Sequence, residues 1–317
     1  MEIINCKDYS YNILEYLDNK SAKSYITSCS QLYKYRDIYY KYKKIKAKSV
    51  KEIPKDMREY IKKISGIEEL EGIEECENLE EIEFGEEFNE EIRGEKYKGE
   101  VENKKRIPKK VRKIKVGRAY NKTIDNISDN IEEIILGAEF NEEVGEVSKK
   151  LKKIEFGHLF NKRIDKISEN VKEIIFGWSF NKKIKLPKNI EKVKFGWMFE
   201  EEIENIKELK ELKEIELGWQ YNRTIEDYPE NIEKIILGFG YKQVINKLPK
   251  KIKEIKIYKK QNKLIKNMEN IKEKIKYKNL ISSDEDIELT SKRKLTYNKR
   301  IIKQMSNNNS YNSYSYF

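Results

Sequence analysis

A glycine that recurs about every 20 residues constrains this sequence more than any other feature. From Gly117 onward the successive intervals are 20, 20, 20, 19, 22 and 20 residues. The same pattern surrounds each glycine, as in VKEIIFGWSFNKKI (171–184), and a ninth copy (252–265) has Tyr258 in the glycine position. Self-similarity at this period is typical of solenoids, in which neighbouring repeats stack on one another. The glycine column is Gly85, Gly117, Gly137, Gly157, Gly177, Gly196, Gly218 and Gly238.

The spacing of apolar residues predicts the structure of each copy. In the copy at 171–184, Ile174 and Phe176 lie two residues apart, which is strand periodicity, and Gly177 follows where the chain should turn. An aromatic residue, usually an asparagine and then an aliphatic residue complete the copy. We predict a parallel β-solenoid of about nine coils, with an aromatic ladder inside and an aliphatic column at the back. The aromatic column is Phe88, Tyr120, Phe140, Phe160, Phe180, Phe199, Tyr221 and Tyr241.

One column of charged residues tests this arrangement within the sequence. The residue before the first strand aliphatic alternates in sign through Glu81, Lys113, Glu133, Lys153, Glu173, Lys192, Glu214, Lys234 and Glu254. Neighbours on a parallel sheet lie about 4.8 Å apart, and like charges directly opposite each other are destabilising. The simpler explanation of this column is that exposed positions of a chain rich in lysine and glutamate are occupied by one or the other. The unbroken alternation of sign favours a true ladder of opposite charges. Because Glu81 and Lys113 continue it, residues 94–105 should bulge out as a loop insertion.

Composition fits a thin core and offers little for catalysis. Hydrophobic residues make up 38% of the 317 residues and charged residues 39%, so a compact globule would lack apolar side chains. His158 is the single histidine, and the three cysteines form no CxxC pair. Nucleophilic catalysis needs a positioned base, and zinc sites need clustered ligands. We therefore expect a protein that is not an enzyme, with no catalytic residue, no metal site and no cofactor.

The same composition bears on location. The N-terminus lacks the basic start and apolar run of a secretory signal, and no stretch approaches the roughly 18 apolar residues of a membrane span. Isolated cysteines indicate a reducing compartment. We expect a cytoplasmic protein without a membrane partner.

The formal net charge of +11 raises the question of nucleic-acid binding. The excess lies at the ends: residues 1–63 carry 15 Lys and Arg against 8 Asp and Glu, and residues 266–317 carry 11 against 6. Residues 64–265 are near neutral, with 41 against 42, and residues 68–91 hold 13 glutamates without a Lys or Arg. Binding to phosphates needs a basic stripe. Nucleic acid is therefore an unfavoured partner, and its binding would weaken steeply with salt.

The segments that flank the repeats differ from them in composition. We predict a basic linker at 46–60, an N-terminal cap at 61–78, a degenerate C-terminal cap at 266–303 and a disordered, low-complexity tail at 304–317. Residues 1–45 have helical spacing instead and form a small separate module.

The segments FGWSFNKKI and FGHLFNKRI resemble the FNIP repeat, a short relative of the leucine-rich repeat. The resemblance covers about residues 79–265 and implies a leucine-rich-repeat-like solenoid. Glu200 and Lys242 depart from the pattern in the asparagine column, as Tyr258 does in the glycine column.

The N-terminal module resembles an F-box, which FNIP proteins of amoebae and their large DNA viruses often carry. The segment ILEYLDNKSAKSYITSCSQLY has a pattern of two helices around a Leu-Asp-x-x-Ser turn, without the usual Leu-Pro at its start. The resemblance implies docking onto a Skp-type adaptor in a cullin ubiquitin ligase, in host cytoplasm if the protein is viral. Core and docking roles would divide among Ile13, Leu14, Leu17, Tyr25, Ile26 and Leu32.

All three tryptophans follow the glycine directly, at Trp178, Trp197 and Trp219, with Phe239 next and His158 before. This column either turns inward and stacks in the core, or forms an exposed aromatic stripe that contacts a partner. The same column holds Glu86 and Arg118, which favours exposure.

These features predict an interaction protein that is a monomer outside its complex. The favoured function is the substrate-recognition subunit of a cullin-type ubiquitin ligase, in which the solenoid selects a protein target. The alternative is a stand-alone repeat scaffold with no link to ubiquitin ligation.

Overall fold

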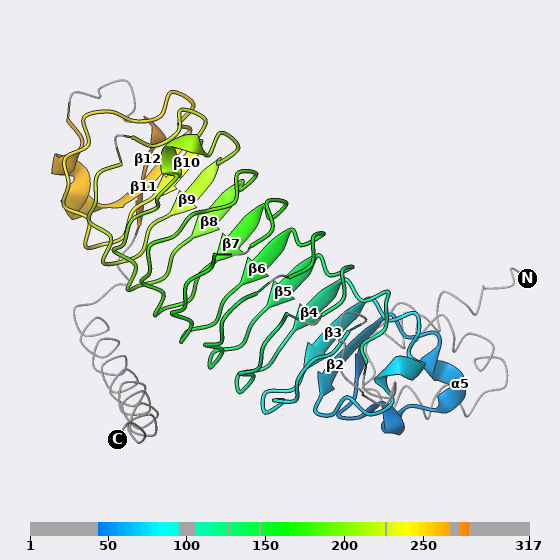
Figure 1. Ribbon diagram of the computed structural model, residues 1–317. Helices are drawn as coiled ribbons and strands as arrows, with labels where there is room; N and C mark the ends of the chain where they lie inside the picture. The colour runs from blue at the N-terminus through cyan, green and yellow to red at the C-terminus, as the bar shows by residue number, and fades with distance from the viewer. Residues whose placement is uncertain are drawn as a thin grey trace, which may run out of the picture.

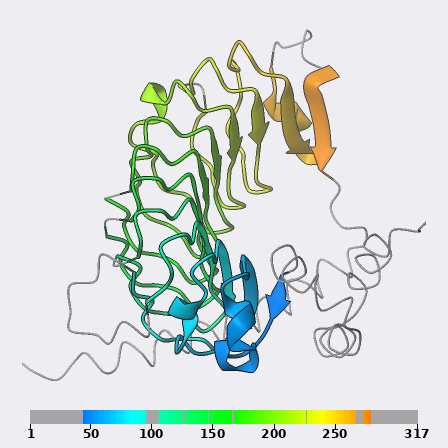
Figure 2. The ribbon, with the colours of Figure 1, turned by 90° about the vertical axis from the view of Figure 1, so that its right-hand side faces the viewer.

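The computed structural model describes residues 44–94, 106–266 other than 126, 146, 166 and 226, and 273–278. In this part of the chain, 12 strands form one parallel sheet in sequence order from β1 to β12 (Figure 1). The coils stack into an arch whose inner side is lined by the sheet (Figure 2). The predicted parallel β-solenoid is confirmed.

The strands are short, and most connections lack regular structure. The strands are β1 (Ile45–Lys46), β2 (Lys63–Ile67), β3 (Glu81–Phe84), β4 (Lys113–Lys115), β5 (Glu133–Ile135), β6 (Lys153–Glu155), β7 (Glu173–Ile175), β8 (Lys192–Lys194), β9 (Glu214–Glu216), β10 (Lys234–Ile236), β11 (Glu254–Tyr258) and β12 (Ile275–Lys278). The helical segments in the described residues are η1 (Val50–Glu52), α5 (Lys55–Arg58), η2 (Ile73–Glu75), η4 (Ile206–Glu208) and η5 (Lys259–Leu264).

The charged column sets the register that the sequence predicts. The nine copies supply β3 to β11, and every neighbouring pair in the alternating column is directly opposite across the sheet. Lys113 lies 2.9 Å from Glu133, and Lys63 on β2 extends the column with a 2.7 Å contact to Glu81. Glu81 also pairs with Lys113, although most of the predicted loop insertion between them lies outside the described residues.

The core is one coil wide and is filled by stacked aromatic rings. Phe160 has no exposed surface, and its ring centroid lies 5.9 Å from Phe140 and 6.0 Å from Phe180 in the adjoining coils. Phe156, which directly follows β6, packs against Phe160 within its own coil at 4.1 Å. The predicted internal aromatic ladder is confirmed.

The glycine column is required by the approach of neighbouring coils. An added Cβ at Gly157 would lie 1.7 Å from the carbonyl oxygen of Gly137, which is far inside van der Waals contact. Among the described glycines, only Gly66 and Gly72 adopt a positive φ. Close stacking therefore explains the column, whereas the turn that follows each strand does not need glycine.

The asparagine column connects the coils by hydrogen bonds. The side-chain oxygen of Asn141 accepts from the backbone N–H of Asn161 at 2.9 Å, and Asn161 accepts in the same way from Asn181 at 2.9 Å. Even Glu200, which departs from the pattern, donates its backbone N–H to Asn181 at 3.1 Å. Each asparagine thus satisfies a backbone donor in the next coil.

Replacing Asn161 by alanine should lower the free energy of unfolding by about 1 to 2 kcal/mol, because the half-buried N–H of residue 181 loses its acceptor. Asn161→Asp keeps an oxygen in place and should cost less. Urea unfolding monitored by circular dichroism compares the two variants. Equal stability of Asn161→Ala and the parent chain would contradict this role.

The N-terminal boundary differs from the prediction. Residues 46–60 are not a linker: β1 pairs with β2, and Val50, Ile53 and Met57 are buried in the core. The segment at 61–78, predicted as the cap, contributes β2 and is an inner coil. Among the described residues, the coil at 44–60 lies on its outer side.

Other predicted segments fall mainly outside the described residues. These are nearly all of the helical module at 1–45, the tail at 304–317 and most of the predicted cap at 266–303. Within that cap, β12 pairs in parallel with β11 and continues the sheet.

Candidate binding surface

The tryptophan column forms a second, external aromatic ladder. Trp178 stacks on Trp197 at 4.7 Å between ring centroids with an interplanar angle of 4°. Trp197 stacks on Trp219 at 4.1 Å and 7°, and Trp219 stacks on Phe239 at 4.6 Å and 24°. Tyr258, in the glycine position of the ninth copy, meets Phe239 edge to face at 5.1 Å. We call residues 178, 197, 219, 239 and 258 the outer ladder.

The sequence left open whether this column turns into the core or forms an exposed stripe, and the outer ladder lies between these two orientations. Its five side chains are half-buried. Because neighbouring rings cover both faces of Trp197 and Trp219, the surface that these two rings leave exposed is at their edges. In the same column Glu86, Arg118 and His158 are exposed. The column therefore faces outward, and stacking between coils shields the ring faces.

Charge on the inner side of the arch is unevenly distributed. The outward positions of β3 to β7 carry five glutamates and three lysines, whereas those of β8 to β12 carry six lysines and three glutamates. The second set is Lys192, Lys194, Glu214, Glu216, Lys234, Glu254, Lys256, Lys276 and Lys278. The outer ladder follows β7 to β10 and ends within β11, so it lies along the basic half of the sheet.

Two lysines pack directly on the ladder. The Nζ atom of Lys260 lies 2.9 Å from the ring centroid of Phe239, and that of Lys278 lies 5.8 Å from the centroid of Tyr258. Partial burial lowers the pKa of Lys278; Glu216 opposes this and Lys194 adds to it. Burial also lowers the pKa of Lys260. Sequence reasoning missed both lysines, because Lys278 lies beyond the repeats and Lys260 does not share the repeat position of the ladder.

The described part of the basic N-terminal segment, residues 44–63, forms ion pairs within the fold. Glutamates from the acidic run at 68–91 pair with the basic residues on either side of that run. Arg58 donates to Glu75 at 2.6 Å, and Glu80 accepts from both Lys62 and Arg112 at 2.6 Å. These pairs leave the N-terminal coils without the uncompensated basic stripe that phosphate binding needs.

Acid should destabilise the array through these paired carboxylates. The hydrogen bond from Lys62, followed by that from Arg112, lowers the pKa of Glu80 against the opposing effect of partial burial. Hydrogen bonds from Lys172 and Lys213 lower the pKa of Glu191 in the same way. A depressed pKa in the folded state contributes stability above the unfolded value of about 4.3, which is lost as pH falls through the folded value. We expect a lower urea midpoint at about pH 3 than at pH 6.

The matched control for that experiment is Glu80→Gln with Glu191→Gln, which should reduce the dependence of the midpoint on pH, while other paired glutamates such as Glu83 and Glu254 maintain the rest. An unchanged midpoint for the parent chain between the two conditions would contradict the prediction.

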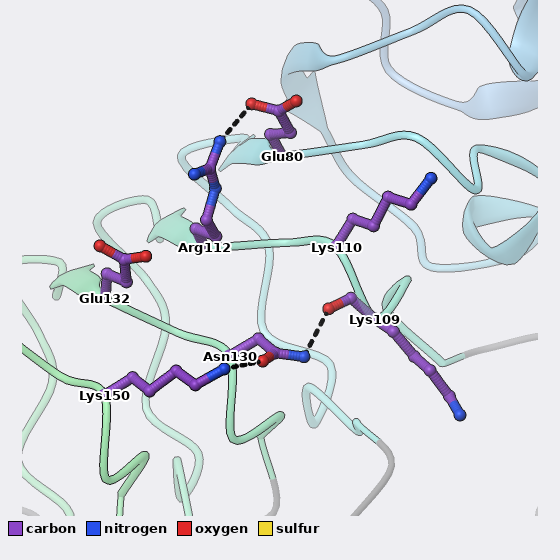
Figure 3. A pocket seen from close by; sticks show the side chains of 7 residues that line it. All are labelled: Glu80, Lys109, Lys110, Arg112, Asn130, Glu132 and Lys150. Atoms are coloured by element: carbon purple, nitrogen blue, oxygen red, sulfur yellow. Dashed lines mark hydrogen bonds and ion pairs between the residues drawn. The ribbon is translucent and has the colours of Figure 1, made fainter.

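A second candidate is a shallow hollow of about 360 Å³ at the N-terminal half, lined by the residues in Figure 3: Glu80, Lys109, Lys110, Arg112, Asn130, Glu132 and Lys150. Three of its cations are engaged within the protein, among them Lys110, which donates to Asn78 Oδ1 at 2.5 Å. Lys150 donates to Asn130 Oδ1 at 2.7 Å, Arg112 donates to Glu80 at 2.6 Å, and Asn130 holds the backbone oxygen of Lys109 at 2.9 Å (Figure 3). Donors that are already engaged by carboxylate and amide groups of the protein are poor partners for a bound anion.

Metal-ligating groups and reactive thiols are two chemical signals that bear on catalysis and metal binding in the described residues. None of their His, Cys, Asp and Glu side chains form a group of three that could hold a metal ion. Cys76 is buried, and burial raises the pKa of its thiol to about 12, which keeps it from acting as a nucleophile. None of the helices in the described part of the chain is long and apolar enough to cross a membrane.

Comparison with known proteins identifies the repeat. The FNIP Repeat family model matches residues 160–198, from the internal Phe160 through Trp197 of the outer ladder. Residues 160–198 are FNIP repeats, and the coils on either side repeat their pattern. No curated protein sequence matches the chain.

Among solved structures, the FNIP array is similar to CroV588, described as a novel circular LRR protein. The TM-score is 0.54 at 23% identity, over 62% of this chain and 30% of that one. The similarity shows a leucine-rich-repeat-like fold, and this chain spans about a third of the length of CroV588. The F-box-like module, with Ile13, Leu14, Leu17, Tyr25, Ile26 and Leu32, lies outside the described residues.

Proposed function

We propose that this FNIP array is a protein-binding module whose contact surface is the outer ladder and the adjoining sheet. A repeat solenoid of the leucine-rich-repeat type is typically a binding scaffold, and its fold suggests protein partners. The observation that carries the proposal is the outer ladder: five aromatic side chains, held in place by coil stacking, are half-exposed. Rigid, half-exposed aromatic residues are enriched in the energetic centres of interfaces.

The experiment compares the full chain with a variant carrying Trp197→Ala and Trp219→Ala. Proteins that bind the parent chain should be lost from the double variant by a factor of about ten or more. The control is Arg118→Ala with Glu86→Ala, at exposed positions of the same column in earlier coils. If the tryptophan variant retains every partner of the parent chain, the outer ladder is not the contact surface.

We further propose that residues 1–45 recruit a Skp-type adaptor, so that the array selects a protein for a cullin ubiquitin ligase. The support is the resemblance of ILEYLDNKSAKSYITSCSQLY to an F-box, combined with an array suited to holding a target. The competing role is that of a stand-alone scaffold.

Binding of the full chain to a purified Skp-type adaptor tests the ligase role. Leu14→Glu in the module should abolish binding of the adaptor while leaving target binding by the array intact. Ile45 must be retained in any variant, because it is buried in β1. Absence of adaptor binding by the parent chain would leave the array as a scaffold.

A further inference from the structure

We propose that the outer ladder and the basic half of the sheet bind an extended acidic segment of a partner protein, in which carboxylate side chains alternate with apolar ones. This inference rests on the proposed function, since it specifies the chemistry of the partner at the same surface.

Charge on this half of the sheet is not balanced within the described residues. Glu216 lies 3.3 Å from Lys194 and 3.7 Å from Lys278. Glu254 lies 2.6 Å from Lys276 and within 3.5 to 3.9 Å of two further lysines, Lys256 and Lys234. Glu214 lies 3.1 Å from Lys234 and 4.0 Å from Lys192. The three carboxylates thus share six lysines, and additional carboxylates from a partner would reduce the repulsion among the lysines.

The stacking of the ladder determines what kind of group it can contact. Rings 4.1 to 4.7 Å apart at interplanar angles of 4 to 7° leave no space for a planar ligand between Trp178, Trp197 and Trp219. A nucleobase binds aromatic residues by stacking on their faces, and neighbouring rings already cover both faces of Trp197 and Trp219. The exposed edges of aromatic rings carry partial positive charge, so they favour carboxylate oxygens and apolar side chains. These contacts favour an acidic peptide over a nucleic acid.

The end of the ladder extends the same chemistry. The Nζ atom of Lys260 lies 2.9 Å from the ring centroid of Phe239, which places a cation against the aromatic surface. One coil further on, Lys278 lies 5.8 Å from the ring centroid of Tyr258 and is paired with Glu216. Five parallel strands at about 4.8 Å spacing extend over about 20 Å, the length of about six residues of extended chain. The occupant is therefore a short linear segment that crosses β8 to β12.

Selection from a display library of random dodecapeptides on the full chain tests this proposal. All three tryptophans of the chain belong to the ladder, so intrinsic tryptophan fluorescence measures binding of each synthetic selected peptide at this surface. We expect peptides enriched in Asp and Glu interspersed with apolar residues, whose affinity falls as salt rises.

The charge variant is Lys194→Gln with Lys278→Gln, and the matched control is Lys113→Gln with Lys115→Gln on β4 in the acidic half. The first should weaken binding by about tenfold or more, whereas the control should leave it within about twofold. Circular dichroism confirms that both variants are folded.

Three outcomes would overturn the proposal. Neutral or basic peptides that need Trp197 and Trp219 but not Lys194 and Lys278 would disprove the acidic partner while supporting the proposed function. Selected peptides whose affinity depends on neither the tryptophan pair nor the lysine pair would contradict the proposal and the proposed function together. A selection without enrichment would do the same. A dodecamer of thymidylate that competes at equal affinity would show that the surface binds nucleic acid.

Discussion

Replacing Gly157 by alanine is expected to lower the free energy of unfolding by about 3 kcal/mol or more. The added Cβ would lie 1.7 Å from the carbonyl oxygen of Gly137 and 2.4 Å from its carbonyl carbon. Both are backbone atoms held in place by the pairing of β5 with β6, so no side-chain rotation can relieve the contact. The neighbouring coils would have to separate, which disrupts the internal ladder as well. Urea unfolding measured by circular dichroism gives the size of the effect.

The first glycine of the column provides the matched control. At Gly85 the nearest atom to an added Cβ is Cγ of Glu68, 3.0 Å away on a flexible, exposed side chain. Gly85→Ala should change stability by less than about 1 kcal/mol, and the smaller freedom of the unfolded chain offsets part of that cost. If both substitutions had the same effect, close coil stacking would not be the reason for the glycine column.

The sequence predicted the repeating part of the fold because every coil meets the same physical demands. Ile174 and Phe176 face the core, Glu173 pairs with its neighbours across the sheet, and the ring of Phe180 stacks on the next coil. Each requirement recurs at a fixed spacing, so every copy independently indicates the same stacked β-coil. The role of the asparagine column stayed hidden, because a side chain that caps a backbone donor in another coil leaves no periodic apolar signal.

The N-terminal boundary could not be predicted from local composition. Residues 46–60 look like a basic linker, and the acidic run at 68–91 looks like an unrelated feature. In the structure Lys51 pairs with Glu71 at 2.8 Å and Arg58 with Glu75 at 2.6 Å, so the two runs neutralise each other in adjoining coils. Opposite charges 17 to 20 residues apart pair only when the chain has folded into coils of that length.

The candidate site was predicted in part. The column of Trp178, Trp197, Trp219 and Phe239 is visible in the sequence because its members share one repeat position. Tyr258 appeared only as a missing glycine, yet its ring extends the ladder against Phe239. The lysines around the ladder do not share that position and come partly from β12, beyond the last recognisable copy. Only the folded arrangement shows that aromatic and basic residues occupy the same half of the sheet.

Replacing Phe160 by alanine should cost about 3 to 5 kcal/mol, because it leaves a cavity in a core that is one coil wide. Its ring is fully buried and stacks on Phe140, Phe156 and Phe180, so no neighbour can fill the space without leaving its own coil. Coils of a solenoid are stabilised chiefly by their nearest neighbours. A cavity in the middle should therefore weaken the coupling between the two halves, and urea unfolding should broaden or divide into two transitions.

The control is Phe160→Tyr, which the chain itself supports. The same column holds Tyr120, whose hydroxyl donates to the backbone oxygen of Thr123 at 3.0 Å, and a tyrosine at 160 would have the carbonyl of residue 163 at the same offset. We expect this variant to stay within about 1 kcal/mol of the parent chain, because it keeps the buried ring and gives its hydroxyl an acceptor. A Phe160→Ala variant as stable as Phe160→Tyr, with one sharp transition, would mean that the internal ladder does not couple the coils. The array would then depend on the sheet and its charged column for cooperativity.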